Sequence, residues 1–235
     1  MATKLKDQNA YIIIYSCIMV VIVAFLLAFV SSALKPAQDV NVALDKKKQI
    51  LAALNIRDLS NEESEKKYNE IITADAIIDE SGKTVEEGTK GGEKAGFTLN
   101  SSDYKAGKLA LFVCNVKGQT KYVIPIYGMG LWGPIWGYIA VNEDGNTIYG
   151  AYFNHEGETA GLGAEIKDSK AWQDKFTGKS IYDSNATPVI KVLKTSEIKN
   201  PASEVDGVTG ATLTSNGVSE MLSEGFKKYK NYLKK

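Results

Sequence analysis

The first feature of the chain is a long apolar run close to its amino terminus. No charged residue occurs from Gln8 to Leu34, and Tyr11–Val30 is almost wholly apolar. About 20 apolar residues, at about 1.5 Å rise each, cross a hydrocarbon layer about 30 Å thick. The small residues at 31–33 allow a cleaved signal peptide as the alternative, but the apolar core of such a peptide is shorter, about 7–15 residues. The pattern therefore favours an uncleaved transmembrane helix over residues 10–34, after a short tail over residues 1–9.

A polar, helix-favouring segment follows over residues 35–80. Pro36 is expected to end the transmembrane helix, because proline cannot donate the next helical hydrogen bond. An apolar stripe then predicts a connecting helix over Val42–Leu54. Ser60 and Glu63 have the spacing of a capping box and predict the start of a second, short helix.

Strand patterns dominate the remaining residues, 81–235, which we expect to form one domain. A loop rich in Gly, Lys and Glu comes first, and Asp144-Gly145 later predicts a tight hairpin. An apolar stripe at helical spacing predicts a terminal helix that includes Val218–Leu233. The fold class expected is α+β, with a mainly antiparallel sheet and flanking helices. The predicted strands are Leu109–Val116, Lys121–Tyr127, Ile135–Val141, Thr147–Phe153 and Val189–Leu193.

Composition removes several classes of function. The chain has 28 basic and 28 acidic side chains, so it lacks the positive charge expected of a nucleic-acid-binding protein. Two cysteines, Cys17 and Cys114, cannot build a disulfide framework or a thiolate zinc site. The single histidine, His155, argues against the usual catalytic metal centres. We therefore expect no metal site, and chemistry that depends on carboxylates, hydroxyls, backbone groups or a borrowed cofactor.

One motif is misleading. Gly128–Gly133 reads G-x-G-x-x-G after a predicted strand, as in dinucleotide-binding proteins. That fingerprint requires a helix to open at once, since the helix amino terminus receives the pyrophosphate. Pro134 and a strand-like run follow instead. We therefore exclude a Rossmann-type site.

Three stretches are richer in glycine than a plain core requires: Gly128–Tyr138, His155–Glu165 and Asp206–Ser215. In the first, glycines alternate with aromatic residues, so the backbone can approach a flat ligand. The second offers free backbone N–H groups and polar side chains to the edge of a ligand. The third leads into the terminal helix, with Thr214 or Ser215 as expected N-cap, where a phosphate is well received. A tight hairpin, a surface turn and simple capping are the respective alternatives.

Taken together, these stretches resemble the C subunit of the sodium-translocating NADH:quinone reductase, a bacterial respiratory complex. Asp206 followed by Thr209-Gly-Ala-Thr212 matches that family's flavinylation motif, D-x-x-(S/T)-G-A-T. The His155–Gly163 and Gly130–Ile135 stretches resemble the other two signatures, and the family also has a single amino-terminal anchor. One departure is Ala160, where the family usually has proline.

The resemblance implies a role for individual residues. Thr212 is the expected site of FMN, attached through a phosphoester by a flavin transferase that uses FAD outside the cytoplasm. The recognition segment for that enzyme is then Asp206, Thr209, Gly210 and Ala211. The residues expected to contact the isoalloxazine ring of the flavin are Glu158, Thr159, Leu162 and Trp132.

The function implied is electron transfer from NADH towards quinone within a membrane complex that pumps sodium, with no reaction by this chain alone. The soluble domain is then expected on the periplasmic side of the inner membrane, and the tail over residues 1–9 on the cytoplasmic side. That placement rests on the resemblance, because lysines on both sides of the anchor leave its orientation ambiguous. The alternatives are the G subunit of the related ferredoxin:NAD electron-transport complex and a membrane-tethered binding domain without cofactor.

Overall fold

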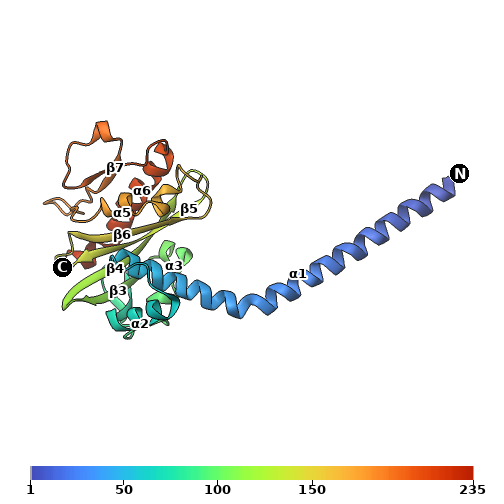
Figure 1. Cartoon of the computed structure of the whole chain (residues 1–235), viewed down its shortest axis with the longest axis horizontal. Coiled ribbons are helices and arrows are strands. Elements are labelled where there is room, and N and C mark those ends of the chain that lie inside the picture. Colours follow the sequence, from blue (N-terminus) through green and yellow to red (C-terminus); the bar gives the residue numbers. More distant parts are fainter. Residues whose placement is uncertain (1, 235) are drawn as a thin grey trace. The chain divides into compact units, whose positions relative to one another are not determined.

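The structure is a computed structural model that describes the backbone of residues 2–234 and the side chains of residues 9–234 (Figure 1). Most of the predicted tail over residues 1–9 therefore lies outside the described side chains. The chain forms two compact units, one up to Asp45 and one from Lys46 onward. The domain boundaries expected from the sequence stay a prediction.

Helix α1 (Ala2–Ala53) contains the whole apolar run. The large apolar side chains of 11–30 are exposed, and the helix is long and apolar enough to cross a membrane. It therefore fits a single-pass membrane anchor. The expectation that Pro36 ends this helix is wrong, because Pro36 lies inside α1. A proline within a helix removes one backbone hydrogen bond, at a cost of about 3 kcal/mol. The helix continues because long helical segments on both sides of Pro36 supply many other backbone hydrogen bonds.

The second unit begins with the last turns of α1. Ile50, Leu51 and Leu54 are buried there, as their stripe predicted. Helix α2 (Asn61–Ile71) opens with the expected capping box: Ser60 Oγ accepts the Glu63 N–H at 3.3 Å, and the Glu63 carboxylate accepts the Ser60 N–H at 2.9 Å.

The main element of this unit is a six-stranded sheet in the order β2-β1-β3-β4-β5-β6. Every neighbouring pair in it is antiparallel. Its longer strands from β3 onward agree with those predicted, and Asp144-Gly145 forms the β5–β6 turn, with Gly145 at a φ of +65°. The strands are β1 (Ile72–Asp79), β2 (Thr84–Glu86), β3 (Lys108–Val116), β4 (Gln119–Met129), β5 (Pro134–Asn142) and β6 (Ile148–His155).

Strand β1 was not predicted and lies at the end of the range that we expected to be helical. The strand is hard to recognise in the sequence because Asp75, a charged residue, occupies a buried position where an apolar residue is expected. Asp75 is only 1% exposed. The Asp75 carboxylate accepts backbone N–H groups from Thr89 and Ala95, both at 3.0 Å. Because these donors come from the loop after β2, the sequence around Asp75 gives no sign of them.

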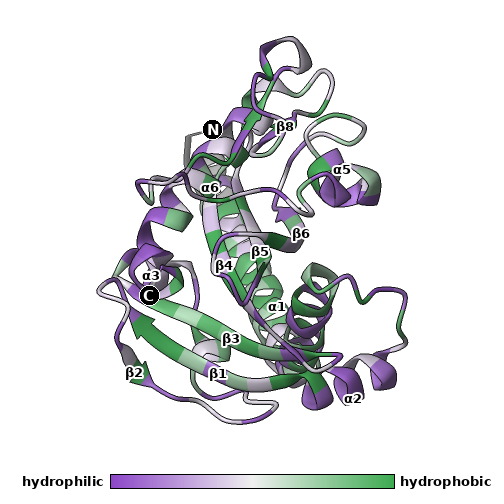
Figure 2. Ribbon diagram, turned by 90° about the vertical axis from the view of Figure 1, so that its left-hand side faces the viewer, coloured by the Kyte–Doolittle hydropathy of each residue, from purple (hydrophilic) through white to green (hydrophobic). Residues whose placement is uncertain are grey.

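Smaller elements complete the domain. Strands β7 and β8 form a separate parallel pair. Figure 2 shows α6 running beside β4 and β5, which it contacts together with β7. The remaining elements are η1 (Gly96–Thr98), α3 (Ser101–Lys105), α4 (Glu165–Asp168), α5 (Lys170–Asp174), β7 (Lys191–Leu193), η2 (Thr195–Glu197), β8 (Glu204–Asp206) and α6 (Thr212–Leu233).

Helix α6 packs unusually close to the sheet. A Cβ atom at Gly225 would lie 2.4 Å from Ile126 Cγ2, and one at Gly217 would lie 2.2 Å from the Met129 carbonyl oxygen. The predicted apolar stripe of α6 is buried, and the Tyr229 hydroxyl donates to the Ala110 carbonyl at 2.8 Å. The two glycines therefore set the distance between α6 and β4. The sequence predicts the α+β class correctly.

We expect Gly225→Ala to lower the free energy of unfolding by about 1–3 kcal/mol, as overpacking usually does. This would reverse the usual gain of about 1 kcal/mol from replacing glycine by alanine within a helix. Chemical denaturation of the purified chain measures the difference. Lys227→Ala, at an exposed position of the same helix, is the matched control. A Gly225→Ala chain more stable than the parent would contradict the close packing.

Candidate functional site

The first glycine-rich stretch forms the β4–β5 hairpin, whose tip is closed by a 2.8 Å hydrogen bond from the Gly130 N–H to the Gly133 carbonyl. Tyr138 is buried in the core, and Trp136 Nε1 donates to Gln49 Oε1 at 2.9 Å. Trp132 lies at the tip and is 68% exposed. Of the three aromatic residues in this stretch, Trp132 is thus the one whose ring is left at the surface.

A buried carboxylate connects this tip to the second and third stretches. Glu158 is only 7% exposed. Its Oε1 accepts the Trp132 N–H at 2.9 Å, and its Oε2 accepts the Thr214 hydroxyl at 2.5 Å. The Glu158 N–H donates to His155 Nδ1 at 3.1 Å, which orients the start of the loop. Charge-assisted hydrogen bonds of this kind are among the stronger ones in proteins.

Two glycines make room for this carboxylate. A Cβ at Gly130 would lie 2.4 Å from Glu158 Oε1, and a Cβ at Gly163 would lie 2.4 Å from Glu158 Oε2 and 2.6 Å from Thr214 Oγ1. Real Cβ atoms do not come that close. Part of the glycine content of the first two stretches is therefore explained by the space that Glu158 needs.

The loop after Glu158 is supported from beneath by a second polar network. Gln173 is fully buried, and its amide donates to the Ile166 and Lys167 carbonyls at 2.9 Å. Arg57 donates to Gln173 Oε1 at 2.7 Å. Burial lowers the pKa of the Arg57 guanidinium from its ordinary value. These contacts join α4 to α5, so the 158–163 loop leads into fixed structure.

The third stretch turns sharply into α6. Gly210 has a φ of +78°, which favours glycine, and α6 starts at Thr212 with Ala211 as the N-cap. The expectation that Thr214 or Ser215 caps this helix is wrong. The Ser215 hydroxyl instead accepts the Val208 N–H at 3.0 Å, and the Thr214 hydroxyl is bonded to Glu158. Both hydroxyls are therefore used to hold the turn and not to cap the helix.

One hollow lies between this turn and the second stretch; we call it the leucine hollow. It is lined by three leucines, by Glu158 and by small and hydroxyl residues. Four predicted ring contacts or attachment residues lie in its wall, whereas Trp132 is not among the lining residues; the four are Glu158, Thr159, Leu162 and Thr212. The lining residues are Leu131, Glu158, Thr159, Leu162, Gly163, Gly210, Ala211, Thr212, Leu213 and Thr214.

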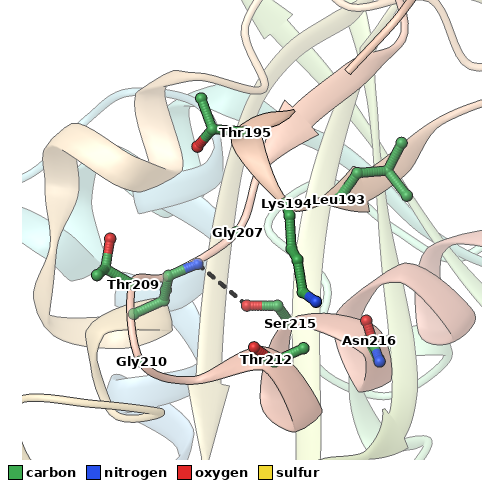
Figure 3. Close-up of a pocket in the computed structure, with 10 residues that line it drawn as sticks. Leu193, Lys194, Thr195, Gly207, Thr209, Gly210, Thr212, Ser215 and Asn216 are labelled. Carbon is green, nitrogen blue, oxygen red and sulfur yellow. Dashed lines mark hydrogen bonds between the residues drawn. The ribbon is translucent and has the colours of Figure 1, made fainter. Parts of the chain in front are cut away.

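A second hollow lies on the other side of Thr212; we call it the lysine hollow (Figure 3). Its side chains are mostly polar, and Lys194 brings a positive charge to it. Thr212 is exposed and lines both hollows. The lining residues are Leu193, Lys194, Thr195, Gly207, Val208, Thr209, Gly210, Thr212, Ser215 and Asn216.

Asp206 faces a different direction. Its carboxylate pairs with Lys175 Nζ at 2.7 Å, and its carbonyl accepts the Trp172 indole N–H at 2.8 Å. Together with Thr209 it lines a third hollow, which is distinct from the leucine and lysine hollows that Thr212 lines. The motif residues therefore fall into two groups, with Thr209 between them.

Comparisons with known proteins agree on one family. Over 96% of its length the chain is 32% identical to the C subunit of the Na⁺-translocating NADH-quinone reductase of Haemophilus ducreyi, 93% of which is covered. It is 31% identical to the same protein of Vibrio parahaemolyticus, with 79% of this chain and 78% of the relative covered. The chain belongs to the C-subunit family of this reductase. The resemblance inferred from the sequence is thereby confirmed, as is the expectation of an oxidoreductase-complex component.

Further comparisons support the fold and the cofactor of this family member. Residues 130–227 match the FMN-binding domain family, a range that includes both the hairpin tip and the start of α6. The crystal structure of the corresponding C subunit from Parabacteroides distasonis superposes with a TM-score of 0.79 at 40% identity, covering 86% of this chain and 98% of that one. FMN is thus the cofactor supported for this domain.

The sequence missed several residues of this site. Leu131 and Leu213 line the leucine hollow, and Lys194 lines the lysine hollow, yet none was predicted. Leu131 directly precedes Trp132 and Leu213 directly follows Thr212, so their adjacency to predicted site residues is a signal that the sequence offered. Nothing in the sequence indicated Lys194, because it comes from a separate strand pair.

We expect Glu158→Ala to lower the free energy of unfolding by about 2–4 kcal/mol, because it leaves the buried Thr214 hydroxyl and the partly buried Trp132 N–H without an acceptor. Glu158→Gln keeps one acceptor oxygen and is expected to cost about half as much. Urea unfolding measures both, with Glu156→Ala, an exposed neighbour in the same loop, as the control. Equal stability of Glu158→Ala and Glu156→Ala would show that the Glu158 contacts contribute nothing.

Proposed function

We propose that this chain carries FMN bound covalently through a phosphoester to Thr212. In this proposal it is an electron-transfer subunit that relays electrons from NADH towards quinone while the complex moves sodium. The observation that carries the proposal is the position of Thr212. Its hydroxyl belongs to an exposed residue at the first position of α6, between an apolar and a polar hollow.

The residues present fit such a cofactor. The leucines of the leucine hollow suit an aromatic ring, and Thr159 and Leu162 stay the proposed ring contacts there. The Glu158 side chain already accepts two hydrogen bonds. We therefore propose that Glu158 shapes the hollow by fixing its walls, and that Trp132 covers its edge from the hairpin tip. FMN, when bound, supplies the redox chemistry of the protein.

Attachment requires one covalent step at Thr212. The Thr212 oxygen forms a bond to the phosphorus on the FMN side of FAD, the pyrophosphate P–O bond breaks, and AMP leaves. The hydroxyl proton passes to a base of the flavin transferase. Gly210 is exposed and has no side chain, so it leaves the backbone near Thr212 open to that enzyme, and the buried Ala211 adds only a small side chain beside the acceptor. Asp206 and Thr209 complete the proposed recognition segment, and the ion pair between Asp206 and Lys175 fixes its start.

The proposed setting is the bacterial inner membrane. Helix α1 anchors the chain, and the domain that follows lies on the periplasmic side, where the transferase acts. The partners are the other subunits of the reductase and, during maturation, the flavin transferase. Covalent attachment keeps the cofactor at a high effective concentration in every redox state.

We expect Thr212→Ala to abolish covalent flavin, because alanine has no oxygen to form the phosphoester. The measurement is a denaturing gel viewed under ultraviolet light after co-expression with a flavin transferase. Thr177→Ala, at an exposed threonine elsewhere, should keep the fluorescent band, and circular dichroism should show that both variants fold. A fluorescent Thr212→Ala band would refute this attachment site.

Removal of residues 1–35 should release the chain from membranes, because the exposed apolar stretch of α1 is then absent. Ultracentrifugation of a lysate, with the full chain as control, measures the distribution. The shortened chain is expected in the supernatant and the full chain in the pellet. Sedimentation of the shortened chain with membranes that lack the other proteins of the complex would contradict the anchor.

A further inference from the structure

We propose that Lys194 is a phosphate-binding residue that pairs with the phosphoester linking FMN to Thr212. The proposal rests on the function proposed above and adds to it the residue that neutralises the charge of the link. No motif of the sequence includes Lys194.

The backbone directly before Lys194 is held from two sides. It follows β7, whose Leu193 carbonyl accepts the Gly207 N–H at 2.8 Å. The preceding Val192 N–H donates to Ser219 Oγ of α6 at 3.1 Å. The backbone before Lys194 is therefore bonded both to the flavinylation motif and to the helix that begins at Thr212.

The side chain of Lys194 is directed into the lysine hollow. Figure 3 shows it extending from its strand end towards Ser215 and Asn216, beside Thr212. Among the described residues Lys194 forms no ion pair. By contrast, Lys175 beside the same motif already pairs with Asp206. Lys194 has no carboxylate partner in the described part of the chain. It thus brings an unpaired positive charge to the lysine hollow, which Thr212 also lines.

The charges on the two sides of Thr212 differ in sign. Lys194 lies on one side, and the carboxylate of Glu158 lies in the wall of the other. A phosphodiester carries one negative charge, which an ammonium group attracts and a carboxylate repels. The phosphate is therefore drawn to the lysine hollow, and the apolar leucine hollow is left for the ring. Thr195 and Asn216 offer further polar groups on the phosphate side.

The test compares Lys194→Gln, Lys194→Arg and the control Lys191→Gln in the full chain in detergent. Lys191 is an exposed lysine at the start of β7, three residues before Lys194 and outside the residues that line the hollow. Purified chains are incubated with a flavin transferase and limiting FAD, and covalent flavin is followed over time by gel fluorescence. Fully loaded chains are then compared by ³¹P NMR, and circular dichroism verifies folding.

We expect Lys194→Gln to load about 3- to 10-fold more slowly, the loss typical of a partly exposed charge-assisted contact. Its phosphorus resonance should also shift from that of the parent. Lys194→Arg keeps the charge and should restore most of the rate, and Lys191→Gln should match the parent in both measurements.

Three results would overturn the proposal. The first is a Lys194→Gln chain with the parent's rate and phosphorus resonance. The second is a slower rate with an unchanged resonance, since the lysine would then affect only docking of the transferase. The third is an unsubstituted chain that carries no flavin on Thr212 by peptide mass mapping. That last result also removes the proposed function, whereas the first two leave it intact.

Discussion

The candidate site depends on the Glu158 carboxylate and the two hydrogen bonds that it accepts. Through them the β4–β5 hairpin, the 158–163 loop and the first turn of α6 meet at one buried group. Such a group is costly to bury unless every polar atom finds a partner. Glycines at 130 and 163 are the local requirement for this arrangement, because any side chain there would displace the carboxylate. The three glycine-rich stretches thus form one structural unit although they are far apart in the chain.

The same arrangement separates two chemical environments at Thr212. Leucines from the hairpin, the loop and the helix gather on one side, while hydroxyl, amide and ammonium groups gather on the other. A cofactor with an apolar ring and an ionised phosphate has the same division within a single molecule. The close packing of α6 on β4, set by Gly217 and Gly225, keeps Thr212 at the boundary. The fold therefore determines which part of such a ligand meets which wall.

Local sequence patterns predicted strands β3 to β7 and the stripe of α6, because alternation and helical spacing directly reflect burial; the short strand β8 was not predicted. They failed where a distant contact decides the outcome. Asp75 hides β1, since its partners come from the loop after β2. Likewise, Thr214 and Ser215 bond to groups outside their own helix turn, so their expected capping role does not occur. The family motifs identified Thr159, Leu162 and Thr212 as neighbours of one site, but Lys194 lies outside every motif.

The exposure of Thr212 in the folded chain has a consequence for biogenesis. A hydroxyl that is buried, or formed into a core contact, has to be modified before the chain folds. Thr212 is instead accessible at the start of a helix whose remaining turns are already fixed against the sheet. A modifying enzyme therefore meets a finished, rigid acceptor and can act late, after the chain has folded. In the attachment proposed for Thr212, folding can therefore come first and modification second.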